Sequence, residues 1–241
     1  MGDRVRCYFQ CRHPRSVSIF MTTSSSRNRL LALYRQLFDR FGPQGWWPGD
    51  TPFEVALGAI LTQNTNWQNV ARVMATLKTE GILDADLLGQ LPEAELARRF
   101  RPAGYYNLKA RRVKNFLDFF AARFKNSMDK MALEELEPLR AELLGLHGIG
   151  PETADSILLY ALHKPTFVVD AYTFRILSRH GLVAEPCSYE ELRRLFMDRL
   201  PSEVSLYQEF HALLVRCAKE FCRPQPRCAG CPLEDWLKND A

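Results

Sequence analysis

Two closely spaced glycines, Gly148 and Gly150, are the feature that most constrains the fold of this chain, because they separate two segments with helical spacing of apolar residues. Glycine adopts positive φ at no steric cost and leaves its backbone N–H uncovered. Pro151 suits the first position of a helix, where a missing N–H costs nothing. The helix that follows has an apolar face, formed by Ala154, Ile157, Leu158 and Ala161. The pattern predicts a helix-hairpin-helix over about 139–162.

The start of the second hairpin helix is a candidate phosphate site, because unpaired N–H groups and the positive end of the helix dipole favour an anion there. An ordinary turn between two helices is the alternative. Asp170 follows Gly150 by twenty residues and precedes another helical segment. Alone, this aspartate is typical of a helix N-cap. The two features together predict a clamp for the DNA backbone that leads to an active-site acid.

The fold class predicted for the whole chain is all-α, because apolar residues recur at spacings of three and four in almost every segment. The predicted helices cover residues 30–41, 53–61, 67–77, 84–88, 93–100, 109–124, 133–144, 151–162, 171–180, 189–200 and 206–218. An apolar content of 46% over 241 residues is enough for a buried core. No segment is long and apolar enough to cross a bilayer, so we expect a soluble protein with no membrane partner.

Residues 1–26 are predicted to be a disordered leader, with an organelle transit peptide as the alternative. This segment carries most of the formal charge of +4, so net charge argues little for nucleic acid. The local pattern argues more, because residues 98–114 contain seven basic residues and no acid. A solvated helix face is the alternative for this stretch.

Three short motifs together resemble one enzyme family. They are Gly-Ile-Gly-Pro-Glu-Thr-Ala-Asp at 148–155, Val-Val-Asp-Ala-Tyr at 168–172 and Leu-Thr-Gln-Asn-Thr at 61–65. They resemble the endonuclease III superfamily of helix-hairpin-helix DNA glycosylases, and most of all its 3-methyladenine glycosylases. The resemblance covers about residues 30–237. It implies two interleaved helical lobes: a six-helix barrel lobe (51–165) that contains the hairpin, and a lobe formed by residues 27–50 and 166–241. It also implies a monomer that binds double-stranded DNA with damaged bases across the groove between these lobes.

The resemblance gives Asp170 the catalytic role. Hydrolysis of an N-glycosidic bond builds positive charge on the sugar, so a fixed carboxylate near C1′ stabilises the transition state and can orient water. Members that also cut the strand carry a lysine two residues after the second glycine, which attacks C1′. This chain has Glu152 there, which predicts a monofunctional enzyme that leaves an abasic site. Lys164 is the nearest alternative amine.

The resemblance also suggests how a nucleotide would be extruded from the duplex. Gln63, with Asn64 beside it, corresponds to the residue that fills the emptied space, although both could simply cap the helix near Trp67. Trp46 and Trp47 lie in a loop rich in turn residues, and the family's base pocket has aromatic side chains at the positions of Trp46 and Trp67. Core packing is the alternative for each tryptophan. An aromatic pocket favours a cationic, alkylated purine through cation–π attraction.

The cysteines indicate a metal site rather than disulfides, because four of the seven fall between residues 217 and 231. Cys222, Cys228 and Cys231 resemble three ligands of the family's 4Fe-4S loop. The fourth family cysteine is absent, and Cys217, on the preceding helix, is the candidate substitute. A zinc site and a vestigial loop are the alternatives. The residues expected to contact the DNA backbone are Gly148, Gly150, Lys109, Arg223 and Arg227.

These features together predict a base-excision-repair glycosylase that removes damaged, alkylated purines, and we expect it in the cytoplasm. The first alternative is a pyrimidine-damage glycosylase that also cuts abasic sites, which Glu152 disfavours. The second is a DNA-binding module without catalysis. Asp170 disfavours this second alternative, because binding alone would gain nothing from a negative charge facing phosphates.

Overall fold

The computed structural model describes residues 23–236, and every regular element in that part of the chain is a helix, which confirms the all-α class. Residues 1–22 of the predicted leader lie outside the described residues. Residues 23–26 belong to the first helix, α1 (Thr23–Phe41), which therefore begins earlier than predicted. The described residues divide into two compact units, which we call the central unit (residues 47–166) and the terminal unit (residues 23–46 and 167–236).

The central unit is built around α2 (Pro52–Leu61), which is buried from residue 54 to residue 61. Thr51 caps this helix by accepting a hydrogen bond from the backbone N–H of Glu54, and Pro52 fits its first turn. The other helices of this unit are α3 (Trp67–Thr79), α4 (Ala85–Gln90), α5 (Glu93–Arg99), η2 (Arg101–Ala103), α6 (Tyr106–Phe124), α7 (Met128–Ala132), α8 (Leu136–Gly145), α9 (Pro151–Ser156) and the π-helical turn η3 (Ile157–Ala161). The central helix packs against α3, α6, α9 and η3.

Within the central unit, α6 carries an apolar face onto α2. Phe120 stacks on Phe53 with 6.2 Å between ring centroids and on Phe116 with 5.6 Å. The five-residue helix α7 was not predicted, because a segment that short shows no apolar period. It follows Lys125 and Asn126, which both have positive φ and turn the chain after α6.

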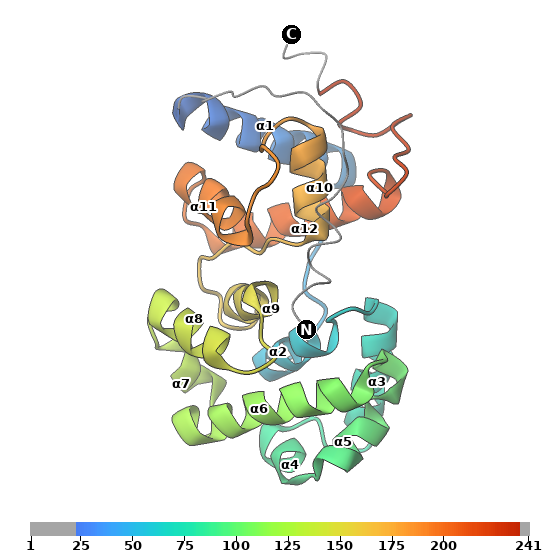
Figure 1. The fold of residues 1–241 in the computed structure, drawn as a ribbon, viewed down its shortest axis with the longest axis vertical. Coiled ribbons are helices and arrows are strands. Elements are labelled where there is room, and N and C mark those ends of the chain that lie inside the picture. The colour runs from blue at the N-terminus through green and yellow to red at the C-terminus, as the bar shows by residue number, and fades with distance from the viewer. Residues whose placement is uncertain (1–22, 237–241) are drawn as a thin grey trace. The chain divides into compact units, whose positions relative to one another are not determined.

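The terminal unit consists of α1, α10 (Ala171–Arg179), α11 (Tyr189–Arg199) and α12 (Val204–Glu220). Figure 1 shows α12 beside α1 and α10, and it packs against both. In the core of the terminal unit, Phe167 stacks on Phe196 with 3.7 Å between ring centroids, and Phe210 lies edge-on to both rings. Residues 167–169, which carry the chain into α10, are buried but form no strand. This packing fixes the residue that follows them, Asp170.

Candidate active site

Asp170 is the N-cap of α10, and the two oxygens of its carboxylate face different partners. Oδ1 accepts hydrogen bonds from the backbone N–H of Thr173 at 2.7 Å and from its hydroxyl at 2.9 Å. Oδ2 lies 3.5 Å from Nε2 of His211 on α12, and 11% of the Asp170 side chain is exposed. Burial by itself would raise the pKa of Asp170, but interaction with His211 and the hydrogen bonds from Thr173 lower it below its usual range. The result is a partly accessible, ionised carboxylate in a fixed orientation.

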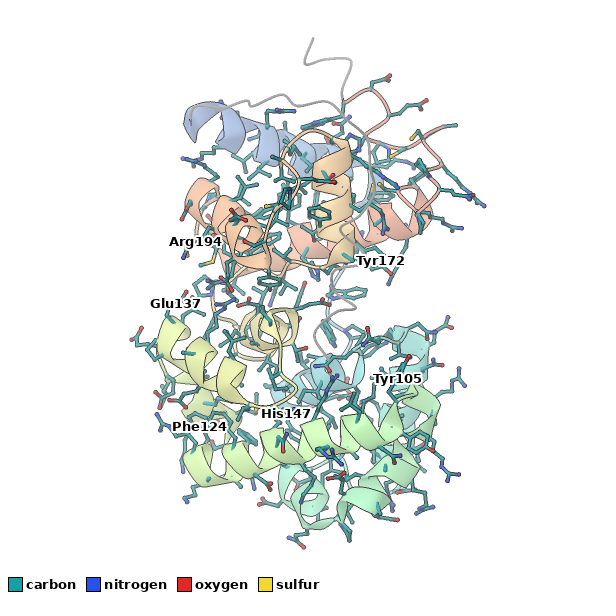
Figure 2. The ribbon with its side chains drawn as sticks, in the orientation of Figure 1. Tyr105, Phe124, Glu137, His147, Tyr172 and Arg194 are labelled. Carbon is teal, nitrogen blue, oxygen red and sulfur yellow. The ribbon has the colours of Figure 1, made fainter. Side chains whose placement is uncertain are left out.

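The hairpin lies in the central unit, where α8 and α9 are joined by the turn that contains His147, which Figure 2 labels. Gly148 has φ +97°, so the turn requires glycine there. Gly150 differs from the expectation that both glycines adopt positive φ: its φ is −92°, and it precedes Pro151 in extended conformation. From α6, Arg112 packs against Gly148 and Asn115 donates a hydrogen bond of 2.9 Å to the His147 carbonyl.

A buried ion pair joins the two hairpin helices. The Arg140 guanidinium on α8 donates two hydrogen bonds to Asp155 on α9, at 2.8 and 3.0 Å. The Thr166 hydroxyl donates a third, at 2.8 Å. Because the Asp155 carboxylate is fully buried, loss of either partner would leave an uncompensated charge. The pair therefore fixes the angle between the helices that flank the turn.

Gln63 is bound to the hairpin rather than projecting from it. Its amide nitrogen donates to the Gly148 carbonyl at 3.1 Å and to the Thr153 hydroxyl at 2.8 Å. Its amide oxygen accepts a hydrogen bond from Arg112. Asn64, next to it, is exposed and has φ 55° at the tip of the turn. Neither residue caps α3, because Asn66 does so.

The three tryptophans proposed for the base pocket fall into two groups. In the central unit, Trp47 contacts Trp67 edge-on at 5.7 Å between ring centroids and Tyr160 at 5.2 Å. Gly58 lies beneath this pair, because a Cβ there would come within 3.3 Å of Trp67 and 3.4 Å of Trp47. In the terminal unit, the Lys219 ammonium lies over the ring of Trp46, with 5.5 Å between its nitrogen and the ring centroid. The ring against Trp67 is therefore Trp47, and a base pocket lined by Trp46 and Trp67 stays a prediction.

The basic stretch at 98–114 is less available to DNA than its sequence indicates. Lys109 is 1% exposed, and its ammonium donates to the Ala103 carbonyl at 2.5 Å, so it does not present a charge to a phosphate. Burial, with a smaller effect from the charge of Arg112, lowers its pKa to about 8. Three other members of the stretch pair with acids outside it: Arg98 with Glu95, Arg99 with Glu80 and Glu95, and Arg111 with Glu93.

The cysteine segment of the terminal unit, residues 217–231, begins in the last turn of α12 and continues beyond it. Arg223 and Arg227 are exposed and line an open hollow there with Pro224 and Gln225. Arg179 supports this segment by donating to the carbonyls of residues 223 and 224 at 2.6 and 2.8 Å. Two guanidinium groups in one hollow suit a phosphate.

The thiols of this segment do not form a closed cage. Cys217 is fully buried, and a hydrogen bond between it and Cys231 raises the pKa of Cys217 and lowers that of Cys231 to about 7. The Cys222 sulfur accepts from Arg179 at 3.3 Å, and Cys228 is exposed. Among residues 23–236, no three His, Cys, Asp or Glu side chains lie close enough to hold a metal ion. The 4Fe-4S group therefore stays a prediction from the sequence.

Several of these partners could not be found from sequence spacing. His211 lies forty-one residues after Asp170, and Arg112 thirty-six residues before Gly148. Tyr160 and Gly58 carry no motif of their own. Each comes to its neighbour only through the packing of helices.

No described helix is both long and apolar enough to span a membrane.

Comparison with known proteins identifies the family. Residues 57–202 match the model of the HhH-GPD superfamily of base excision DNA repair proteins. A candidate DNA repair glycosylase of Methanocaldococcus jannaschii is 46% identical over 206 residues, which cover 85% of this chain and 93% of that protein. The crystal structure of Helicobacter pylori 3-methyladenine DNA glycosylase bound to 1,N6-ethenoadenine is 28% identical, with a TM-score of 0.69 over 83% of this chain and 98% of that one. A non-covalent complex of endonuclease III with DNA has the same fold, with a TM-score of 0.74, 21% identity and coverage of 89% and 99%. The chain therefore belongs to the helix-hairpin-helix superfamily of base-excision-repair proteins and is a DNA N-glycosylase.

Proposed function

We propose that this glycosylase hydrolyses the N-glycosidic bond of alkylated purines and leaves the DNA strand intact. The observation that carries the proposal is the fixed, ionised carboxylate of Asp170 in a chain that has Glu152 in the hairpin position of the lyase lysine. A carboxylate can stabilise a sugar cation, and a glutamate cannot form an imine.

Asp170 supplies the catalytic charge in this proposal. As the bond to the base breaks, positive charge grows on the sugar, and an anion that is already oriented stabilises the transition state more than the ground state. Thr173 occupies Oδ1, so Oδ2 is the oxygen with acceptor capacity left for the attacking water or the sugar. The low pKa of Asp170 keeps the group ionised at neutral pH.

Strand cleavage through an imine requires a free amine. Neither the residue at the position of the family lysine, Glu152, nor the nearest lysine, Lys164, supplies one in this proposal. Glu152 is exposed in the first turn of α9. The Lys164 ammonium donates to the carbonyls of Ala132, at 2.9 Å, and Glu134. An ammonium held by two carbonyls is a poor nucleophile, because it must lose both bonds and a proton before it can attack.

DNA binding is proposed to use the hairpin turn in the central unit and the Arg223 and Arg227 hollow in the terminal unit, with the protein acting as a monomer. Lys109 is left out of this surface because it is buried. Asn64 is the exposed candidate for the wedge, and Gln63 could join it only by giving up its bonds to the hairpin.

The choice of alkylated purines rests on the aromatic groups and on one relative. Base stacking on an aromatic side chain is worth about 1–3 kcal/mol, and a cationic base adds a cation–π attraction. Trp47 and Trp67 are the proposed stacking residues in the central unit, and Trp46 is a third candidate in the terminal unit. The H. pylori relative is named for excision of 3-methyladenine and binds 1,N6-ethenoadenine.

A panel of duplex oligonucleotides tests both parts of the proposal. Each duplex carries one lesion, either an alkylated purine, an oxidised pyrimidine or a mismatch, and products are scored with and without alkaline treatment. We expect excision of the alkylated purines and strand breaks only after alkali. Asp170→Asn should abolish base release and leave affinity for abasic DNA equal or higher. Excision confined to oxidised pyrimidines refutes the substrate class, and full activity of Asp170→Asn refutes the assignment of the catalytic acid.

A further inference from the structure

His211 is the polar member of an otherwise apolar buried segment. On α12, its neighbours Phe210, Ala212, Leu213, Leu214 and Val215 are all buried, and His211 itself is only 5% exposed. A buried imidazole is costly unless a polar partner compensates for its lost hydration. Its Nε2 lies 3.5 Å from Oδ2 of Asp170. The position of the histidine is therefore explained by the carboxylate and not by packing alone.

The two partners of Asp170 divide the carboxylate between them. Thr173 engages Oδ1 from within α10, in the manner of an N-cap. A cap of this kind fixes one oxygen but leaves the carboxylate able to turn about it. His211 faces the other oxygen from a different helix, so a hydrogen bond from its Nε2–H would fix the plane of the group. All these residues belong to the terminal unit.

We propose that His211 is a positioning residue for base excision, whose Nε2–H holds Oδ2 of Asp170 toward the sugar. The 3.5 Å separation is long for an N–H···O hydrogen bond, as contacts of catalytic groups often are before substrate binds. Closing it requires only a small adjustment of the carboxylate. His211 acts through Asp170 and needs no contact with DNA. The inference rests on the proposed function, because it assumes that Asp170 performs the chemistry.

The test compares His211→Leu with His211→Gln. Leucine fills a similar volume with an apolar side chain and removes the donor, whereas the amide nitrogen of glutamine reaches about as far as Nε2. Single-turnover excision of an alkylated purine gives the rate at the chemical step, and titration with abasic-analogue DNA gives the Kd. His211→Leu should lower the rate roughly 10- to 100-fold, the effect expected for loss of one hydrogen bond to an ionised group. Its Kd should stay unchanged, and His211→Gln should recover most of the rate.

Tyr207→Phe is the matched control, because Tyr207 lies one helical turn earlier on α12 and is fully buried. It should keep the wild-type rate. If His211→Leu does not fold, His211→Asn replaces it, since the shorter amide stops near Nδ1 and should be slower than His211→Gln. A wild-type rate in His211→Leu overturns the inference. So does a rate in His211→Gln that is equal to the rate in His211→Leu or, where that variant does not fold, in His211→Asn. Wild-type protein without excision on any lesion would instead refute the proposed function.

Discussion

Gly148→Ala is expected to be the most damaging single methyl addition in the hairpin. The backbone of residue 148 has φ +97°, where an L-residue is strained by about 1–3 kcal/mol. The new Cβ would also lie 2.4 Å from Cγ of Arg112. This atom is near the base of the arginine side chain, so it cannot simply swing away, and such overpacking costs about 1–3 kcal/mol. The two costs together should lower the free energy of unfolding by about 2–6 kcal/mol.

Gly150→Ala is the matched control in the same turn. Its φ is −92° and nothing lies within 4 Å of the position of a new Cβ, so the change should stay within about 0.5 kcal/mol. Thermal unfolding followed by circular dichroism measures both variants. For a chain of this length, each kcal/mol shifts Tm by about 2–4 °C. Abasic-DNA affinity should fall with Gly148→Ala and much less with Gly150→Ala.

A double-mutant cycle separates strain from collision. In an Arg112→Ala background, Gly148→Ala should retain only the backbone cost, so the two changes should couple by about 1–3 kcal/mol. Additive effects would show that the arginine does not resist the methyl group. Equal losses at residues 148 and 150 would refute the account altogether, because it depends on the difference between their backbones.

Three further outcomes are expected. Borohydride treatment during turnover should trap no covalent protein–DNA adduct, because Glu152 cannot form an imine, and efficient trapping would identify a lyase amine elsewhere. If the cysteine segment binds a 4Fe-4S cluster, purified protein should contain about four irons per chain. Cys217→Ser should then lose the iron as fully as Cys228→Ser does, and iron-free protein with full activity would show that packing alone holds the segment. Trp67→Ala should slow excision of alkylated purines by about 1–3 kcal/mol of lost stacking and spare abasic-DNA binding, so a uniform loss of both would place Trp67 in the core instead.

The features that could be predicted from the sequence are those set by neighbouring residues. Helical spacing fixed the all-α class, and Asp170 precedes its helix as an N-cap does, with its partner Thr173 three residues on. The positive φ of Gly148 is likewise a property of one short turn. Gly150 does not share this property, because a residue before proline is pushed toward extended backbone and does not need to be glycine.

The features that could not be predicted depend on residues brought together by packing. Gln63 has the side chain that a wedge needs, but its donors and acceptor are taken up by Gly148, Thr153 and Arg112, which lie at least forty-nine residues away in the sequence. Which of Trp46 and Trp47 contacts Trp67 could not be predicted either, since adjacent residues in an irregular loop can point to different neighbours. Composition and spacing carry no record of such pairings.

Lys109 differs from these cases, because the sequence did contain the signal for its burial. It shares a face of α6 with Val113, Phe116 and Phe120, at spacings of four, three and four. This periodicity places the side chain in the core whatever its charge. The hydrogen bond to the Ala103 carbonyl compensates for part of the lost hydration of the buried ammonium. Burial lowers the pKa of Lys109 to about 8. A lysine or arginine in a helix of this chain is thus a candidate DNA contact only where its position lies off the apolar face. Arg223 and Arg227 lie outside the helices and are exposed, so they remain candidates.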